Sequence, residues 1–387
     1  MMTALERLLG DLVRIPSPTP PGDTREIARF IAGELSSTGA GVRVLAPPEK
    51  PGAESVVAVL GEGRPVVVLH AHLDTVPVAD DEKLRWSHDP FTPTVRDGRL
   101  YGKGSADDKA PLAAMMTAFK KVGEGQANGT LVLVAAAEEE VGGQLGTRWL
   151  ADAGHLPHAD LIVVGEQTHN RVALAHKGVM RASVTVRGRS VHATEPDRGV
   201  NAVTAAAKIV LELAHYHAAL RERTHPLVGH PTCNVGVIHG GSTANAVPDR
   251  CTLQLDRRVL PGEDPEAVKA ELREVVADAS LGEATAEVHD FLYSSPFDSG
   301  LETPLGRAFQ ACVDAAFGGP QEPVGYLPGS DAKHLMALQR GDMVVFGPGG
   351  FEVAHAFDEY VELAELAACE AILTSFLTKT LRGTTRE

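Results

Sequence analysis

Short runs of β-branched and aliphatic residues, each closed by a polar residue, constrain the fold of this chain most. The runs are SVVAVL (55–60), PVVVLHAHLD (65–74), TLVLVAAAEEE (130–140) and DLIVVGEQ (160–167). Helix-like stretches separate them, including one from Lys109 to Val122. Continuous apolar runs bounded by turn residues are typical of strands buried on both faces. The pattern predicts an α/β fold in which a mostly parallel sheet lies between helices.

The residue pattern changes after Gly178, where alternating apolar and polar residues indicate strands with one exposed face. The predicted elements are the strand 179–189, the helix 201–220, the strands 233–241 and 251–260, the helix 264–279 and the strand 285–293. This order is βαββαβ, an α+β arrangement with a small antiparallel sheet and helices on one face. We therefore expect a catalytic domain in two segments, 1–178 and 293–387, with a domain inserted at 179–292.

Composition excludes several classes of partner. The net charge is −15 and no block of Lys and Arg occurs, which argues against nucleic acid and anionic membranes. No apolar run approaches the roughly 18 residues that would span a bilayer. The N-terminal sequence MMTALERLLGDLVRIP carries charges where a signal peptide needs an apolar stretch, so a cytoplasmic location is expected. The four cysteines are scattered, so a metal would be held by histidine and carboxylate.

Candidate metal ligands stand at the ends of the predicted strands. His72 and Asp74 lie two residues apart on one strand face, where an aspartate can orient a metal-bound imidazole, although this pair alone is a weak signal. Asp107 lies in the glycine-bracketed loop YGKGSADDK, and a helix cap is an alternative role for it. His355 follows a glycine-rich turn before the last helix, where a structural histidine is the alternative.

Two further strand ends carry glutamates. Three consecutive glutamates, including Glu139 and Glu140, close the run TLVLVAAA, and Glu166 closes LIVVG. Like charges at a buried strand end are unfavourable unless a cation or protons compensate them. A solvated turn is the alternative for the three consecutive glutamates. Taken together, the two histidines, Asp107, Glu140 and Glu166 match two zinc ions that share a carboxylate, with a spare glutamate as base.

An ordered set of motifs extends this interpretation over nearly the whole chain. The motifs are HAHLDTVP, YGKGSADDK, EEEVGG, VGEQ, GRSVHATEPDRGVNAV, GGSTANAVPD, LDRRVLPGED and GPGG followed by AHAFDEYV. They resemble those of the acetylornithine deacetylase / succinyl-diaminopimelate desuccinylase family, which includes aminoacylase and glutamate-releasing carboxypeptidase relatives. The resemblance implies a zinc-peptidase-like catalytic domain and an inserted, ferredoxin-like lid or dimerisation domain. It also implies a homodimer.

The resemblance assigns a role to each matching residue. His72 and Glu166 would bind one metal, Glu140 and His355 the other, and Asp107 both. Asp74 would orient His72, and Glu139 would be the general base. In the inserted domain, His192 matches a histidine that stabilises the transition state, and Asn245 and Arg258 match substrate-binding residues. A surface arginine on a strand is the alternative for Arg258. Gly329 matches a substrate-side glycine loop.

Three positions depart from the family pattern. Glu138 stands where Asp is usual, Gln167 where Pro is more common, and Asp108 where Met is frequent. None of them removes a ligand. The implied activity is hydrolysis of the amide bond of a small N-acyl amino acid with two Zn²⁺ per chain, for which Co²⁺ or Mn²⁺ could substitute. A carboxypeptidase- or dipeptidase-like metallopeptidase is the alternative, because both reactions use the same metal chemistry.

Overall fold

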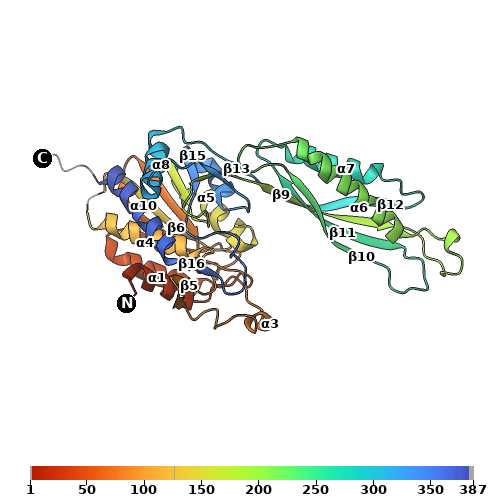
Figure 1. Cartoon of the computed structure of the whole chain (residues 1–387), viewed down its shortest axis with the longest axis horizontal. Helices are drawn as coiled ribbons and strands as arrows, with labels where there is room; N and C mark the ends of the chain where they lie inside the picture. The colour runs from red at the N-terminus through yellow and green to blue at the C-terminus, as the bar shows by residue number, and fades with distance from the viewer. Residues whose placement is uncertain (1, 126, 383–387) are drawn as a thin grey trace. The chain divides into compact units, whose positions relative to one another are not determined.

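The computed structural model describes residues 2–125 and 127–382. The chain divides into two compact units, each with its own sheet and helices (Figure 1). Unit 1 contains the residues up to Leu174 and those from Ser299 onward, and unit 2 is Ala175–Asp298. Unit 2 encloses the segment 179–292, which is the predicted insertion. The two units are described separately below.

The main sheet, which belongs to unit 1 except for β13 and the last two residues of β8, has parallel strands at its centre. The strand order is β1-β2-β6-β3-β7-β15-β8-β13, with β14 paired to β8. The pairs β6–β3, β3–β7 and β7–β15 are parallel, and the outer pairs are antiparallel. The strands are β1 Gly41–Leu45, β2 Ser55–Glu62, β3 Val66–His72, β6 Gly129–Ala136, β7 Ala159–Val164, β8 Ala173–His176, β13 Phe297–Asp298, β14 Val324–Tyr326 and β15 Gln339–Val345. The predicted α/β fold with a mostly parallel central sheet is confirmed.

Helices cover this sheet because its central strands are apolar on both faces. Every residue of β7 is buried, and so is every residue of β3 after Val66. Helix α4 packs against β3 and β6 and contacts both α1 and α10, while α8 packs against α10, β7 and β15. The helices of unit 1 are α1 Ala4–Arg14, α2 Arg25–Leu35, α3 Asp80–Lys83, α4 Lys109–Gly123, α5 Trp149–Asp152, α8 Pro304–Phe317, α9 Ala332–Leu335 and α10 Leu363–Leu381.

A second, three-stranded sheet in unit 1 joins distant parts of the chain. Strands β4 (Thr94–Arg96), β5 (Arg99–Tyr101) and β16 (Tyr360–Glu362) pair antiparallel in the order β16-β5-β4. This pairing places the segment that follows His355 beside the segment that precedes Asp107. Both candidate ligands therefore lie next to the same small sheet.

Unit 2 has the predicted βαββαβ order. Strands β9 (Gly178–Arg187), β10 (Thr232–Gly240), β11 (Arg250–Val259) and β12 (Thr285–Ser294) form an antiparallel sheet in the order β10-β11-β9-β12. Helices α6 (Ala202–Ala219) and α7 (Pro265–Asp278) contribute to a core with alternate residues of the strands. This alternation explains the period-2 pattern of the sequence, since one face of each strand is covered and the other is not.

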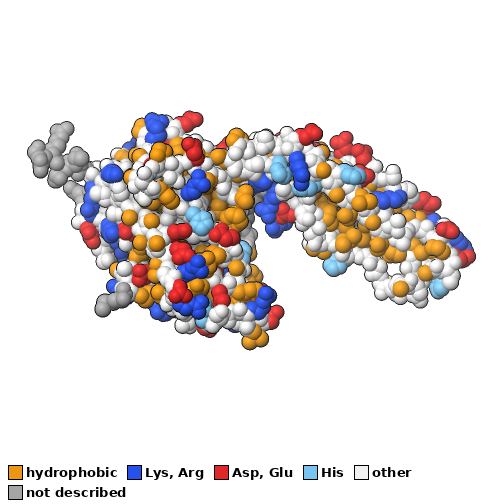
Figure 2. Space-filling model, viewed as in Figure 1, with side chains coloured by type: hydrophobic (Ala, Val, Ile, Leu, Met, Phe, Trp, Pro, Cys, Tyr) orange, Lys and Arg blue, Asp and Glu red, His pale blue; other side chains and the backbone are white. Residues whose placement is uncertain are grey.

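The surface is mixed in charge. On the face shown in Figure 2, acidic and basic side chains are interspersed among apolar ones. None of the helices within residues 2–125 and 127–382 combines the length and the hydropathy that a membrane crossing requires.

Candidate functional site

The carboxyl ends of three adjacent parallel strands bring the first candidates together. His72 is the last residue of β3, Glu139 and Glu140 lie in the 3₁₀ turn Glu139–Val141 after β6, and Glu166 lies just after β7. Because β6, β3 and β7 are neighbours in the sheet, these side chains meet at one edge, where sites form in open α/β sheets.

Asp107 lies at the centre of the cluster. One of its carboxylate oxygens is 3.0 Å from His72 Nε2, and the other is 3.2 Å from His355 Nε2. His355 Nε2 is also 3.1 Å from Glu140 Oε2. Ligand atoms of His72, Asp107 and Glu140 all lie within 4.8 Å of one another. A carboxylate with one oxygen toward each histidine has the geometry of a bridging ligand.

A buried glutamate holds the Asp107 loop in place. The Glu359 carboxylate accepts hydrogen bonds from the backbone N–H groups of Gly104, Ala106 and Asp107, at 3.1, 2.9 and 3.0 Å. Its charge is paired with Lys103 Nζ at 2.9 Å, and both side chains are buried. The Asp107 carboxylate itself faces the histidines, and the neighbouring Asp108 is the N-cap residue of α4. The Asp107 side chain therefore contacts the candidate histidines, while the N-cap position of α4 belongs to Asp108.

Glu166 is linked to Asp107 through Gln167. Gln167 Nε2 donates to Asp107 Oδ1 at 3.0 Å and to Glu166 Oε2 at 3.3 Å. The Tyr326 hydroxyl donates to Glu166 Oε2 and lies equally close, at 2.9 Å, to Gln167 Oε1. All four side chains are buried. The departure from proline at position 167 therefore adds an amide that connects two candidate ligands.

Glu139 has a different environment from Glu140. Its Oε1 lies 3.5 Å from the ammonium group of Lys333, which is 6% exposed. Burial raises the pKa of Glu139 to about 7, and the Lys333 charge opposes that shift. Glu140, in contrast, accepts a hydrogen bond from the backbone N–H of Val76 and contacts His355. The two adjacent glutamates thus face different partners, one a cation and the other a candidate ligand.

Asp74 contacts both His72 and the turn that carries Glu139 and Glu140. Its carboxylate accepts hydrogen bonds from the backbone N–H groups of Glu139 and Glu140, at 3.2 and 3.4 Å. The Nδ1 atom of His72 is 3.0 Å from the Asp74 backbone carbonyl and 3.6 Å from its carboxylate. The nearer acceptor for the imidazole is therefore the carbonyl, while the carboxylate orders the turn that carries the two glutamates.

The chemistry of this donor set fits a metal centre. Burial raises the pKa values of Glu140, Glu166 and Asp108. Burial also opposes ionisation of Asp107, but hydrogen bonds from His355 and His72 hold its pKa well below the usual range. Desolvation disfavours several adjacent carboxylate anions unless cations compensate them. Imidazole nitrogens together with carboxylate oxygens are ligands that zinc accepts.

A cavity of about 210 Å³ opens onto these groups. Its lining consists of Asp107, Glu139, Glu140, Glu166, Gln167, Tyr326, Pro328, Gly329, Phe351, Ala354 and His355. The four carboxylates of the lining come from the Asp107 loop and from the segments that follow β6 and β7. The segments around Gly329 and Phe351 contribute His355, Tyr326 and the apolar residues Pro328, Phe351 and Ala354. His355 has a left-handed backbone conformation, with φ of 60°, which is uncommon outside glycine and is found most often in turns and functional sites.

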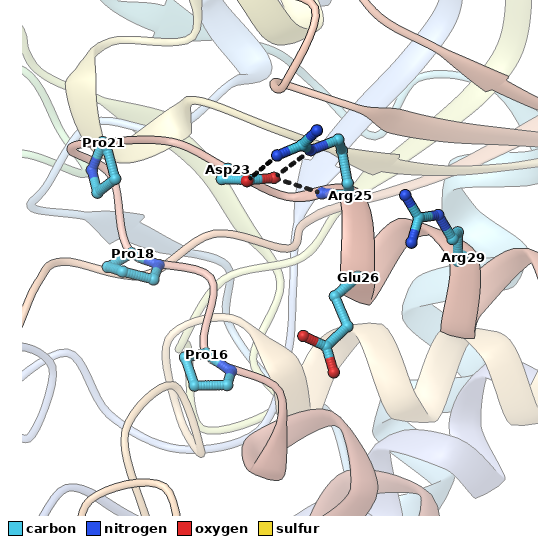
Figure 3. Close-up of a pocket in the computed structure, with 7 residues that line it drawn as sticks. All are labelled: Pro16, Pro18, Pro21, Asp23, Arg25, Glu26 and Arg29. Atoms are coloured by element: carbon cyan, nitrogen blue, oxygen red, sulfur yellow. Dashed lines mark hydrogen bonds and ion pairs between the residues drawn. The ribbon is translucent and has the colours of Figure 1, made fainter.

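A larger hollow elsewhere in unit 1 lacks such chemistry. It has a volume of about 510 Å³ and lies along the loop before α2 and the start of that helix (Figure 3). Its lining consists of Pro16, Pro18, Pro21, Asp23, Arg25, Glu26 and Arg29. Asp23 is hydrogen-bonded to Arg25, which lowers the pKa of Asp23 to about 2. We therefore place the candidate site at the smaller cavity, where the metal-ligating side chains converge.

The three remaining candidates belong to unit 2. His192 is exposed, and its Nδ1 is 2.8 Å from the Thr194 hydroxyl. The Asn245 side chain accepts a hydrogen bond from Thr243, and its backbone carbonyl accepts one from the N–H of Ala193. The His192 and Asn245 segments are thus adjacent within unit 2.

Arg258 directly follows the fully buried Arg257 in the chain. Arg257 is paired with Glu263 and Tyr216 inside unit 2, whereas Arg258 Nε is 2.8 Å from Asp256 Oδ1 and its side chain is 36% exposed. Arg258 therefore retains donors that are accessible to solvent. Arg257 has a structural role.

Comparison with known proteins decides the family. The model of "Peptidase family M20/M25/M40" matches residues 68–379, which is most of the chain.

This chain belongs to peptidase family M20/M25/M40.

Relatives and solved structures agree with this membership. The chain is 32% identical over 343 residues to acetylornithine deacetylase of Pectobacterium carotovorum subsp. carotovorum, covering 87% of this chain and 86% of the relative. The M20 family metallo-carboxypeptidase Sso-CP2 of Sulfolobus solfataricus has a TM-score of 0.78 at 20% identity, covering 97% of this chain and 99% of that chain. The Bacillus subtilis YXEP protein, a dinuclear metal-binding peptidase of the M20 family, has a TM-score of 0.73 at 17% identity, covering 98% of each chain. The chain is a metal-dependent hydrolase.

Two residues of this M20 family site were not identified from the sequence. Lys333 contacts Glu139 and Tyr326 contacts Glu166, but Lys333 lies in α9 and Tyr326 ends β14, more than a hundred residues later in the chain. Neither residue type has a spacing that marks it as a site residue. The only local signal is the glycine- and proline-containing segment GYLPGSDAK, in which Gly329 is the one predicted site residue.

Proposed function

We propose that this M20 family hydrolase binds two zinc ions and cleaves the amide bond of a small N-acyl amino acid. The observation that carries the proposal is the cluster in which Asp107 contacts both candidate histidines while Glu140 contacts one of them. The name of the relative from Pectobacterium, acetylornithine deacetylase, supports a deacylase in preference to a peptidase.

The ligand assignment follows from the contacts of each residue. We assign His72 and Glu166 to one ion and Glu140 and His355 to the other, with Asp107 shared between them. The hydrogen bonds from Gln167 to both Asp107 and Glu166 support placing these two carboxylates at one ion. The contact between His355 and Glu140 supports the other pair.

The proposed reaction uses the chain's own residues for proton transfer. When bound, a pair of divalent ions polarises a carbonyl and lowers the pKa of a water molecule from 15.7 to about 7. Glu139 lines the cavity without contacting either histidine, so its carboxylate is available to accept a proton from the attacking water. Glu139 then delivers that proton to the leaving amine nitrogen. Lys333 holds the carboxylate near this position through its 3.5 Å contact.

Unit 2 would supply the groups that recognise the rest of the substrate. We assign stabilisation of the oxyanion to His192, whose ring is exposed and fixed through Nδ1 by Thr194. Arg258 and Asn245 would hold the substrate carboxylate, because the half-exposed guanidinium of Arg258 retains donors for bidentate binding. We further propose a homodimer, in which a second copy completes the site.

The test is a hydrolysis panel on protein freed of metal and reloaded with Zn²⁺, Co²⁺ or Mn²⁺. At least one of the N-acetyl, N-succinyl and N-formyl amino acids should be cleaved, activity should require two ions per chain, and dipeptides should be poor substrates. Cleavage of dipeptides alone would instead assign the chain to the peptidases. Full activity with no more than one tightly bound ion would contradict the dinuclear centre.

A further inference from the structure

We infer that the cavity of unit 1 selects substrates whose substituent beside the scissile amide is apolar and uncharged. This inference rests on the proposed deacylase function and names the substrate class of that site. It comes from two observations: the segments around Gly329 and Phe351 contribute apolar residues to the lining, and every acidic group in the lining already has a partner within the protein.

The apolar residues of the cavity lining come from two segments of the chain. Phe351 lines the cavity and is 42% exposed, and Ala354 and Pro328 line it as well. Leu327, next to Pro328 in the chain, is 50% exposed. Binding is favoured when a ligand removes exposed apolar side chains from water. An apolar substituent can cover them without the cost of losing a hydration shell of its own.

The carboxylates in the lining are not free to bind a cationic substituent. Asp107 contacts His72 and His355, and Glu140 contacts His355 and the backbone N–H of Val76. An ammonium group on a substrate would have to displace these partners or the bound ions. It would therefore lose its hydration without gaining a new ion pair.

The other two lining glutamates are also engaged. Glu166 accepts from Tyr326 and Gln167, and Glu139 contacts Lys333. Glu352 follows Phe351 in the chain, but its carboxylate is paired with His169 at 3.2 Å. No acidic side chain that lines this cavity remains without a partner among the described residues.

An acidic substituent would also lack a charged partner in this cavity. Among the described residues that line the cavity there is no lysine or arginine, and the ring of His355 is already shared by Asp107 and Glu140. Lys333 is 6% exposed and contacts Glu139 and the carbonyl of Ser330. A second carboxylate on the substrate would have no cationic partner in this cavity, so neither sign of charge is accommodated.

The substituent can belong to the acyl group or to the amino acid, and two series of compounds distinguish these sources. One series keeps the acetyl group and varies the amino acid among phenylalanine, leucine, ornithine and glutamate. The other keeps leucine and compares acetyl, butyryl and succinyl groups. In at least one series the apolar member should have a kcat/KM about tenfold or more above the charged members. Equal or reversed preference in both series would overturn the inference.

Two matched variants test whether Phe351 is responsible. Phe351→Asp should lower kcat/KM for the apolar substrate by about tenfold and raise it for the ornithine derivative, since a carboxylate without a partner then lines the cavity. Phe317→Asp is the control, because Phe317 is similarly exposed, at 47%, but lies at the end of α8 and not in the cavity lining. A preference that moves equally in both variants, or in neither, would contradict the assignment. Phe351→Leu should retain the wild-type preference, which excludes a simple folding defect.

A binding measurement separates failure of this inference from failure of the proposed function. The zinc-loaded Glu139→Gln variant should bind the apolar derivative more tightly than the charged ones in calorimetry, whether or not the native enzyme hydrolyses any of them. Absence of hydrolysis by the wild-type protein together with this binding order would refute the proposed deacylase reaction and keep the inference. Hydrolysis by the wild-type protein together with equal binding of all derivatives would refute the inference and keep the proposed deacylase reaction.

Discussion

The candidate residues of the two units differ in how firmly the fold holds them. In unit 1, Asp107 and Glu166 are buried, and their carboxylates have several partners from distant strands and loops. In unit 2, His192 and Asn245 are exposed and have side-chain partners only two residues away. The first arrangement is preorganised for one geometry, whereas the second leaves side chains free to meet a substrate. Substitutions should therefore damage the two units in different ways.

The largest effect should come from Glu139, which separates proton transfer from metal binding. Glu139→Gln should retain the metal content of the native protein and lose roughly 10²–10⁴-fold in turnover, because only the general base is removed. Glu140→Gln should instead lose metal, since it removes a proposed ligand. Elemental analysis and kcat measured on the same preparations check both statements. Near-normal turnover of Glu139→Gln would show that another group takes the proton.

Removal of metal should distinguish the units by stability. A ligand present at about 1,000 times its Kd stabilises the native state by about 4 kcal/mol, a factor of about 10³, and the proposed ligands lie in unit 1. Chelation should therefore accelerate hydrogen exchange at the backbone amides of Asp107 and Glu140, while exchange in α6 and α7 of unit 2 should stay within experimental error. Equal acceleration in both units would contradict a centre built from unit 1 alone.

His192 should be important for turnover without affecting stability or metal content. His192→Ala should lower kcat by about 10²–10³-fold, the usual effect of losing one oxyanion donor. If the histidine serves the partner's site, mixing equal amounts of His192→Ala and Glu139→Ala should restore about a quarter of wild-type activity. Half of the dimers would then be mixed, each with one complete site of two. The mixture must first be shown to exchange subunits, for instance with differently tagged chains.

A mixture that exchanges subunits and remains inactive would mean that His192 acts within its own chain. It would not affect the assignment of the metal ligands, which rests on contacts inside unit 1. The complementation result therefore concerns unit 2 and the proposed homodimer.

The smallest effect should come from the hydroxyl of Tyr326. Tyr326→Phe removes the hydrogen bond to Glu166 and leaves the ring in place. Loss of such a supporting contact typically weakens metal binding by about 10- to 100-fold, which a competition titration with a chromogenic chelator can measure. Tyr293→Phe in β12 of unit 2 is the matched control and should leave metal affinity unchanged. A weaker affinity in both variants would indicate a general loss of stability.

Much of the fold could be predicted because it depends on local patterns. Uninterrupted apolar runs indicated the buried central strands β3 and β7, and alternation indicated the sheet of unit 2. The candidate ligands were recognisable for the same reason, since polar residues at the ends of buried strands stand out against an apolar background. His72 and Glu166 are the clearest examples.

Other features could not be predicted because they depend on contacts between segments that are distant in the chain. Lys333 and Tyr326 approach Glu139 and Glu166 only after the chain has folded, and no periodicity in the sequence marks them. Asp74 was predicted to orient His72, and its carboxylate lies 3.6 Å from His72 Nδ1, but strand alternation alone could not show that this carboxylate would bind the backbone of the Glu139–Glu140 turn. Such contacts depend on loop conformation, which a residue pattern does not specify.

The hydrogen bonds between Glu359 and the Asp107 loop have a consequence for how the protein is made. Asp107 and its acceptor Glu359 are 252 residues apart in the chain, and Glu140 and His355 are 215 residues apart. During synthesis on a ribosome, chains are extended from the N-terminus, so all of unit 2 is complete before either partner segment appears. A nascent chain that ends before residue 355 has four of the five proposed ligands and lacks the Glu359 carboxylate that holds the Asp107 loop. The complete set of proposed ligands, together with the Glu359 carboxylate that supports the Asp107 loop, therefore exists only after synthesis has passed residue 359.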